Sequence, residues 1–242
     1  MPRFFVNPDQ INGHNAVLTG QQASHSKVLR LKPGDAVTLC DGNGVDFYCS
    51  ISEIRPQETL LRVERSVPSD SEAQVFVSIY MAYAKGDKLE HVIQKATELG
   101  AGEIIAFPAS RCVAKMDEKT LQKKLSRWQK IAESAAEQSG RGRIPQVLAM
   151  GSYMEALERA SRADTPVFFF ENETRHTLSE ALRDTFFTVS LMTGPEGGFS
   201  AEEVEQAAAA GMQICTLGRR ILRCETAPLC ALSAVMFAAG EY

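Results

Sequence analysis

The residues best suited to chemistry form a glycine-rich loop, Gly194-Pro195-Glu196-Gly197-Gly198, directly after an apolar strand that ends at Thr193. Glycines around a proline give a rigid turn whose backbone can approach a ligand closely. Ser200 can cap the following helix, with Glu203 at the capping-box position. Because ligands bind beyond the carboxyl ends of strands in open α/β sheets, this loop is a candidate binding site. A plain strand-to-helix turn is the alternative interpretation.

The loop also indicates which ligands are excluded. It matches neither the dinucleotide fingerprint Gly-x-Gly-x-x-Gly nor the phosphate loop that ends in Gly-Lys-Ser/Thr. Glu202 and Glu203 in the first helical turn would repel a phosphate group from that helix end. A nucleoside without phosphate fits better, and S-adenosylmethionine, whose sulfonium is positive, is such a ligand.

A second glycine follows the next predicted strand, in the segment Leu217-Gly218-Arg219-Arg220-Ile221-Leu222-Arg223-Cys224. The segment opens a further helix, which Glu225 or Thr226 can cap. Its arginines, Arg219, Arg220 and Arg223, suit an anionic polymer, although a solvated loop would explain them as well. Because two successive strands are each followed by a glycine, we expect the two loops to form one site together.

A long predicted helix over 117–139 carries a basic face. Four cations fall within about 80° of one another at 100° per residue, opposite an apolar stripe that includes Leu125 and Trp128. This face predicts a track for RNA phosphates, and a solubilising surface is the alternative. The candidate RNA-binding cations on and beyond it are Lys119, Lys123, Arg127, Lys130, Arg141 and Arg143, joined by Lys27, Arg30 and Lys32 near the N-terminus.

Composition bounds these hypotheses. The 242 residues carry a formal net charge of −4, so any RNA binding must come from local basic patches. The six cysteines have no Cys-x-x-Cys pair and no histidine at zinc spacing, so we expect core thiols and no metal. With no apolar run approaching the ~20 residues of a membrane span and no secretion signal, the expected location is the cytoplasm.

The elements that must position these residues fall into two domains. Residues 1–69 show short strands at 4–6, 36–39, 47–51 and 60–63 between glycine turns, with one helical segment at 21–29, which is typical of a small β-barrel. A polar linker at 66–72 follows. Residues 73–242 alternate strands, expected at 75–82, 103–107, 166–170, 188–193 and 213–217, with helices, expected at 87–99, 117–139, 152–162 and 225–239. The predicted class is therefore α/β, with a parallel sheet flanked by helices.

Together these motifs resemble the RsmE family, the bacterial 16S ribosomal RNA (uracil-N3) methyltransferases of the knotted SPOUT superfamily. The resemblance spans nearly the whole chain in one order. It rests on the stretches 29–35 (LRLKPGD), 85–88 (KGDK), 94–100 (QKATELG), 133–143 (ESAAEQSGRGR), 194–198 (GPEGG) and 217–227 (LGRRILRCETA).

The resemblance implies a C-terminal trefoil knot, an N-terminal PUA-like RNA-binding barrel and a homodimer acting on the small ribosomal subunit. It also implies that three loops hold S-adenosylmethionine. Carried over to this chain, the cofactor-binding residues are Phe170, Glu171, Thr193, Gly194, Pro195, Gly197, Gly198, Leu217, Gly218, Ile221, Leu222, Thr226 and Ala227. The related ribose methyltransferases carry an Asn-rich third motif where this chain has Glu225-Thr226-Ala227, which argues against 2′-O-methylation.

Methylation at N3 requires that a weakly acidic proton leave the uracil ring. A base can take it, or a nearby positive charge can lower its pKa. We expect Arg223 to supply the charge and Glu196 or Glu225 to accept the proton. Each acid also has a structural alternative, since Glu196 can bond loop amides and Glu225 can cap its helix.

Two other classes of protein compete with this hypothesis. A nucleotide-dependent oxidoreductase or phosphotransferase would need a phosphate-binding glycine fingerprint after the first strand of its domain, where this chain has Lys85-Gly86-Asp87-Lys88. A non-catalytic RNA-binding factor for ribosome assembly would explain the basic helix and the barrel, but it would leave both glycine loops without a role.

Overall fold

The computed structural model describes residues 1–113 and 116–242, which separate into two compact units. The N-terminal unit comprises Met1–Glu72 together with Ala136–Ile144, and the C-terminal unit comprises Ala73–Ala135 together with Pro145–Tyr242. Among these described residues, every helix is too short or too polar to cross a lipid bilayer.

The N-terminal unit is a mostly antiparallel six-stranded sheet in the order β1-β4-β5-β6-β3-β2, in which only β1 and β4 pair in parallel. Alternate side chains of its strands meet in a core that includes Phe4, Leu18 and Leu39. The predicted strands and helix of this part are confirmed, whereas β2 and β3 were not predicted. The elements are β1 Arg3–Phe5, η1 Pro8–Gln10, β2 Ile11–Asn12, β3 Asn15–Thr19, α1 Gly20–Val28, β4 Ala36–Cys40, β5 Val45–Ile54 and β6 Glu58–Pro68.

An ion pair lies within the N-terminal unit, between the buried Arg141 and the partly buried Glu72. The guanidinium Nη2 of Arg141 lies 2.6 Å from Oε2 of Glu72, and Oε1 of Glu72 also accepts from the Gly142 amide at 2.9 Å. Arg141 is 5% exposed, so its side chain is part of the interior. We expected Arg141 to contact RNA; the structure gives it a structural role, because its side chain is buried and paired with Glu72.

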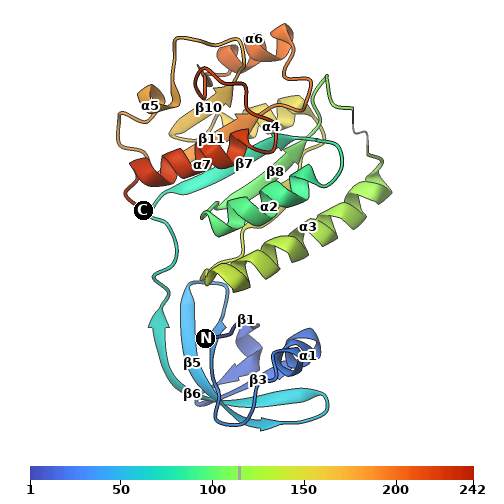
Figure 1. The fold of residues 1–242 in the computed structure, drawn as a ribbon, viewed down its shortest axis with the longest axis vertical. Helices are drawn as coiled ribbons and strands as arrows, with labels where there is room; N and C mark the ends of the chain where they lie inside the picture. The colour runs from blue at the N-terminus through green and yellow to red at the C-terminus, as the bar shows by residue number, and fades with distance from the viewer. Residues whose placement is uncertain (114–115) are drawn as a thin grey trace. The chain divides into compact units, whose positions relative to one another are not determined.

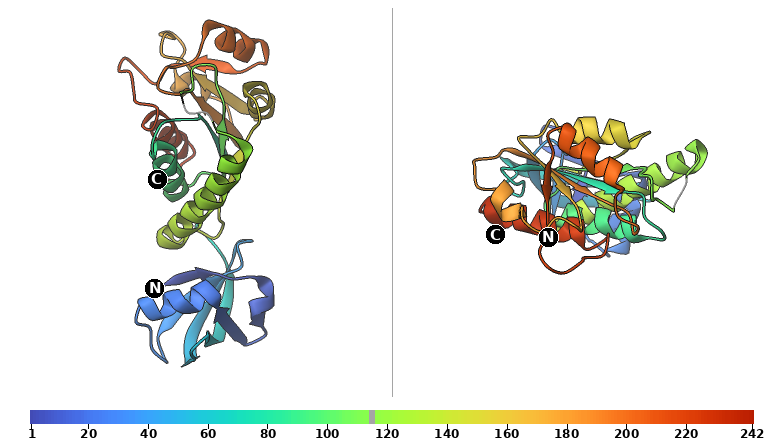
Figure 2. Two further views of the ribbon diagram at one scale, coloured as in Figure 1. Left: turned by 90° about the vertical axis from the view of Figure 1, so that its right-hand side faces the viewer. Right: turned by 90° about the horizontal axis from the view of Figure 1, so that it is seen from above.

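The C-terminal unit contains a six-stranded sheet in which every pair is parallel, in the order β12-β10-β11-β7-β8-β9. Seen from above in Figure 2, α4 and α6 cover one face of this sheet and α2 and α7 cover the other. Most of the elements are labelled in Figure 1. They are β7 Phe76–Ala82, α2 Lys88–Glu98, β8 Glu103–Phe107, α3 Glu118–Ser139, β9 Gln146–Ala149, α4 Tyr153–Ala160, β10 Thr165–Phe169, α5 Leu178–Ala181, β11 Thr188–Thr193, α6 Ala201–Ala209, β12 Gln213–Cys215 and α7 Ala227–Ala238.

The predicted α/β alternation is confirmed, and the differences have local causes. The Ser200–Glu203 capping box forms in both directions, which fixes the start of α6. At the start of α4 only half of a capping box forms: Ser152 Oγ accepts from the Glu155 amide, but the Glu155 carboxylate accepts from the Gly151 amide. The short strand β9 was not predicted, because four residues are too few to show a period.

The strand order brings three loops together. β10 lies between β12 and β11, and all three run in the same direction. Their carboxyl ends therefore meet at one edge of the sheet, where the segments after Phe169, Thr193 and Cys215 leave it. In a parallel sheet this edge is where ligands bind.

Candidate active site

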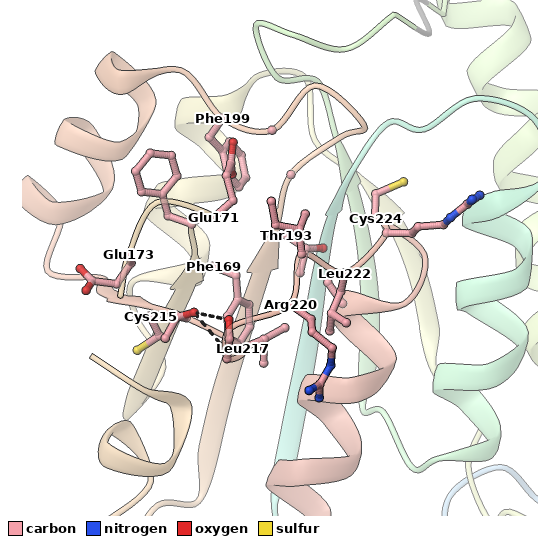
Figure 3. A pocket seen from close by; sticks show the side chains of 18 of the residues that line it. Phe169, Glu171, Glu173, Thr193, Phe199, Cys215, Leu217, Arg220, Leu222 and Cys224 are labelled. Carbon is pink, nitrogen blue, oxygen red and sulfur yellow. Dashed lines mark hydrogen bonds between the residues drawn. The ribbon is translucent and has the colours of Figure 1, made fainter. Parts of the chain in front are cut away.

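The three loops enclose a cavity of about 860 Å³, which is within the usual range for small-molecule sites. Figure 3 shows side chains from each loop around it, among them Glu171, Thr193 and Leu217. The described residues that line it are Lys88, Phe169, Phe170, Glu171, Glu173, Thr174, Thr177, Thr193, Gly194, Pro195, Glu196, Gly197, Gly198, Phe199, Cys215, Thr216, Leu217, Gly218, Arg219, Arg220, Ile221, Leu222, Arg223, Cys224 and Ala227.

The glycine-rich loop forms one wall of the cavity and is held from both sides. Gly198 adopts a φ of +67°, and a Cβ atom there would overlap the carboxylate of Glu171. The side chain of Arg111 donates to the carbonyl of Gly197 at 3.1 Å. Beneath the loop, Phe199 is buried and its ring centroid lies 4.2 Å from that of Phe168. The backbone of this loop is therefore closely packed and ready to face a ligand.

The loop after β10 carries carboxylates. Oε1 of Glu173 accepts from the amides of Thr174, Arg175 and His176 at 2.8, 2.6 and 3.2 Å. The amides of Arg175 and His176 lower the pKa of Glu173 to about 2, so this group is ionised at neutral pH. With Glu171 beside it, this side of the cavity favours a positively charged ligand.

The loop after β12 is basic and open to solvent. Gly218 takes a φ of +100°, which turns the chain out of the strand, and its carbonyl accepts from Thr216 Oγ1 at 3.1 Å. Arg219, Arg220 and Arg223 are all exposed, and Ile221 between them is 85% exposed. Cations and an exposed apolar side chain here suit a polyanion that carries bases.

A cluster of charges at one end of the cavity joins Lys88 to two acids. Lys88 Nζ lies 2.9 Å from Glu196 Oε1 and 3.6 Å from Glu225 Oε2. Burial alone would raise the pKa of Glu196, but hydrogen bonds from Lys88 Nζ and the Lys85 amide outweigh burial and lower it. The pKa of Glu225 is also lowered: burial opposes the shift, while its own amide, the Cys224 thiol and Lys88 favour it. Both acids are therefore carboxylates at neutral pH.

The structure brings most of the predicted site residues together. Every predicted cofactor-binding residue except Thr226 lines the cavity, as do Glu196 and Arg223. Glu225 and Thr226 are not among the lining residues, but Glu225 forms a salt bridge with Lys88, which does line the cavity. Sequence reasoning gave no role to Lys88, Glu173 or Phe199. The Lys85–Lys88 stretch contributed to the family resemblance, but no local pattern indicated what its second lysine would contact.

The remaining predicted RNA-binding residues differ in how exposed they are and in whether they already have a partner within the protein. Lys119, Lys123 and Lys130 are exposed on α3, while Arg127 of the same face is paired with Glu90 at 2.7 Å. In the N-terminal unit Arg30, Lys32 and Arg143 are exposed, and Lys27 donates to the Pro56 carbonyl. Arg30 has a positive φ of 56° at the end of α1, a conformation that directs the chain sharply out of the helix.

The fold and the cavity together define a class: an α/β protein with a small-molecule binding site at the ends of parallel strands, preceded in the sequence by a small β unit. Comparison with known proteins places the chain within that class. The RNA methyltransferase domain family matches residues 71–236, and the RNA methyltransferase PUA domain matches residues 18–64. The chain belongs to the RNA methyltransferase family whose curated members are called ribosomal RNA small subunit methyltransferase E.

The similarity extends over nearly the whole chain. The relative with that name from Bacillus subtilis (strain 168) is 36% identical over 227 residues, covering 91% of this chain and 89% of the relative. A solved ribosomal RNA small subunit methyltransferase E from Neisseria gonorrhoeae, bound to S-adenosylmethionine, has a TM-score of 0.89 at 33% identity and covers 98% of this chain and 97% of that one. A methyltransferase from Legionella pneumophila in complex with the same cofactor gives 0.87 at 28% identity, with 98% and 97% covered.

Proposed function

We propose that this chain transfers the methyl group of S-adenosylmethionine to N3 of a uridine in small-subunit ribosomal RNA. The observation that carries the proposal is the cavity at the ends of β10, β11 and β12, which is lined by both acidic and basic residues. The names of the curated relatives and the cofactor bound in two structural relatives support it.

The residues of the cavity fit this cofactor. Its volume suits a nucleoside joined to an amino acid, and its glycine-rich wall lets backbone amides and carbonyls approach the ligand. Glu171 and Glu173 provide negative charge for the sulfonium and the amino group, while Leu217 and Leu222 supply apolar surface. When bound, S-adenosylmethionine supplies an already activated methyl group. The protein's task is then to hold the acceptor atom in line with it.

The uracil N3–H bond must break during transfer. Arg223 is exposed at the cavity, where its guanidinium can approach a uracil carbonyl and stabilise negative charge on the ring. Glu196 or Glu225 accepts the proton, and the N3 electron pair forms the bond to the methyl carbon as the carbon–sulfur bond breaks. Because N3 is a base-pairing atom, the target uridine must be unpaired or flipped out of its stack.

The exposed cations provide the RNA contacts in this proposal. They are Lys123 and Lys130 on α3, Arg219 and Arg220 beside the cavity, and Lys27, Arg30, Lys32 and Arg143 in the N-terminal unit. Contacts of this kind go mainly to phosphates, so they position the RNA without reading its sequence. We assign Arg127 the same role once RNA competes with Glu90 for its guanidinium.

The proposed enzyme is a cytoplasmic homodimer with a trefoil knot in residues 73–242 and a PUA-like module in residues 1–69. Support for the dimer comes from α7, whose exposed side carries Cys230, Ala234 and Phe237 at spacings of four and three, with Phe237 72% exposed. An apolar strip of this kind is suited to burial against a second copy. Sedimentation velocity tests it: Phe237→Glu should yield monomers, and a wild-type protein that sediments as a monomer would rule the dimer out.

The function is tested with small ribosomal subunits that lack the modification. Incubated with the protein and S-adenosylmethionine labelled in its methyl group, these particles should take up label in their RNA. Cofactor binding measured by calorimetry separates the competing hypotheses. A protein that binds RNA but not S-adenosylmethionine would be a non-catalytic assembly factor.

A further inference from the structure

Lys88 is the first residue of α2, and its side chain joins three segments that are distant in the sequence. Its Nζ donates to Glu196 Oε1 of the glycine-rich loop at 2.9 Å, lies 3.6 Å from Glu225 Oε2 before α7, and lies 3.8 Å from Cys224 Sγ. The side chains of Lys88, Glu196 and Glu225 are only 29%, 27% and 21% exposed, so water screens these interactions incompletely.

The same cluster contains further hydrogen bonds that fix its geometry. Oε1 of Glu196 also accepts from the Lys85 amide at 3.0 Å, which ties the glycine-rich loop to the turn before α2. The Cys224 thiol donates to Glu225 Oε2 at 3.3 Å. The titratable groups that face the acids are thus Lys88 from α2 and Cys224 from the loop before α7, with the thiol of Cys112 near Glu196.

The two carboxylates that could accept the N3 proton therefore share a single ammonium group. Hydrogen bonding to Glu196 raises the pKa of Lys88, so the amine is protonated at neutral pH and is not itself a base. Burial raises the pKa of the Cys224 thiol to about 11, so this neighbour is uncharged. Lys88 is the one cation with a salt bridge to either acid among the described residues.

We propose that Lys88 is a positioning residue for methyl transfer, which holds Glu196 and Glu225 ionised and oriented at the end of the cavity where the uracil proton leaves. The inference rests on the proposed function. In the transfer step the N3–H bond breaks and a carboxylate oxygen takes the proton. The N3 electron pair forms the new N–C bond, and the electron pair of the C–S bond stays on sulfur. The ammonium remains paired with the second carboxylate throughout.

The test compares Lys88→Met, Lys88→Arg and a matched control, Lys95→Met. Lys95 lies on the same helix and pairs with Glu98 at 2.8 Å, away from the residues that line the cavity. Single-turnover methyl transfer is measured from pH 4.5 to 8 with saturating cofactor and RNA. In parallel, carbon NMR follows the titration of the Glu196 and Glu225 carboxyl groups in the same variants without substrate.

We expect Lys88→Met to slow transfer at least tenfold near neutral pH and to move the acid limb of the pH–rate profile to higher pH. The direction of this shift follows from the charges. Lys88 lowers the pKa of both acids, so its loss raises both pKa values, and the two carboxylates become protonated at a higher pH. The NMR midpoints should rise in the same variant, and both Lys88→Arg and Lys95→Met should keep the wild-type limb.

An equal loss of rate at every pH, or unchanged NMR midpoints in Lys88→Met, would overturn the proposal and leave Lys88 a purely structural residue. The NMR titration needs no substrate. Absence of methyl transfer by the wild-type protein would therefore count against the proposed function, while the titration would still report on the Lys88 bridge.

Discussion

Gly198 lies directly against the carboxylate of Glu171, with a φ of +67° and no room for a Cβ atom between them. The contact links the loop after β11 to the loop after β10, so two walls of the cavity are fixed relative to each other at this point. Glycine is needed here for two separate reasons, its backbone conformation and the close approach of a neighbouring side chain.

Gly198→Ala should therefore weaken the binding of S-adenosylmethionine at least tenfold, because Glu171 must move out of place. The matched control is Gly211→Ala just after α6, where φ is also positive, at +85°, but no described residue lies within 4 Å of the added atom. Both variants should lose about 1–2 kcal/mol of stability from the strained φ. If calorimetry gave the two variants the same affinity for the cofactor, the contact with Glu171 would have no role in the site.

Arg223→Ala should lower the rate of methyl transfer at least a hundredfold and change the affinity for S-adenosylmethionine little, because its charge is assigned to the uracil and not to the cofactor. Arg162→Ala, which removes an exposed arginine that lies just after α4 and pairs with Glu158 of that helix, should behave as wild type. Single-turnover rates and calorimetry together make the comparison. Near-normal transfer by the Arg223 variant would refute the assignment.

Arg141 and Arg143 provide a contrast between a structural and a surface arginine. Arg141→Ala should destabilise the protein by about 3 kcal/mol, since it removes a buried side chain and leaves the partly buried Glu72 without its charge partner. Arg143→Ala should stay within about 0.5 kcal/mol of wild type, as is usual for exposed positions, and should weaken RNA binding instead. Urea unfolding and RNA binding at two salt concentrations distinguish these outcomes. A stable Arg141 variant with reduced RNA affinity would restore the role first expected for it.

Glu173 should make stability depend on pH at the acid end. Its pKa is lowered to about 2 by the amides of Arg175 and His176. A carboxylate with a lowered pKa contributes stability above its unfolded pKa near 4.5, and this contribution is lost as the pH falls toward 2. Glu173→Gln should therefore flatten the fall in Tm between pH 4.5 and 2, whereas Glu205→Gln, at an exposed position of α6, should not. Identical curves for the two variants would contradict the assignment.

Sequence reasoning predicted elements of the fold correctly where an apolar run was long or where a local motif such as a capping box was present. The apolar runs of β8 and β11 and the Ser200 capping box were predicted at their observed residues because each is determined by neighbours in the chain. The cavity loops were found for the same reason, since glycine at the end of a strand is a local signal.

What sequence reasoning missed depends on contacts between distant residues. Nothing near Lys88 indicates that Glu196 and Glu225 lie beside it, more than a hundred positions away. Arg141 looked like part of a basic surface because its neighbours are basic, and only the fold shows that it is buried and paired with Glu72. An arginine can be a structural residue or an RNA-binding surface residue, and the side chain with which it pairs in the fold decides which of the two it is.

The central claim is most directly tested by identifying the methylated nucleoside. Small-subunit RNA from particles incubated with the protein and labelled S-adenosylmethionine is digested to nucleosides, which are separated and weighed by mass spectrometry. The proposed function predicts that the label elutes as 3-methyluridine. Label in a 2′-O-methylated nucleoside or in any base other than uracil would contradict it.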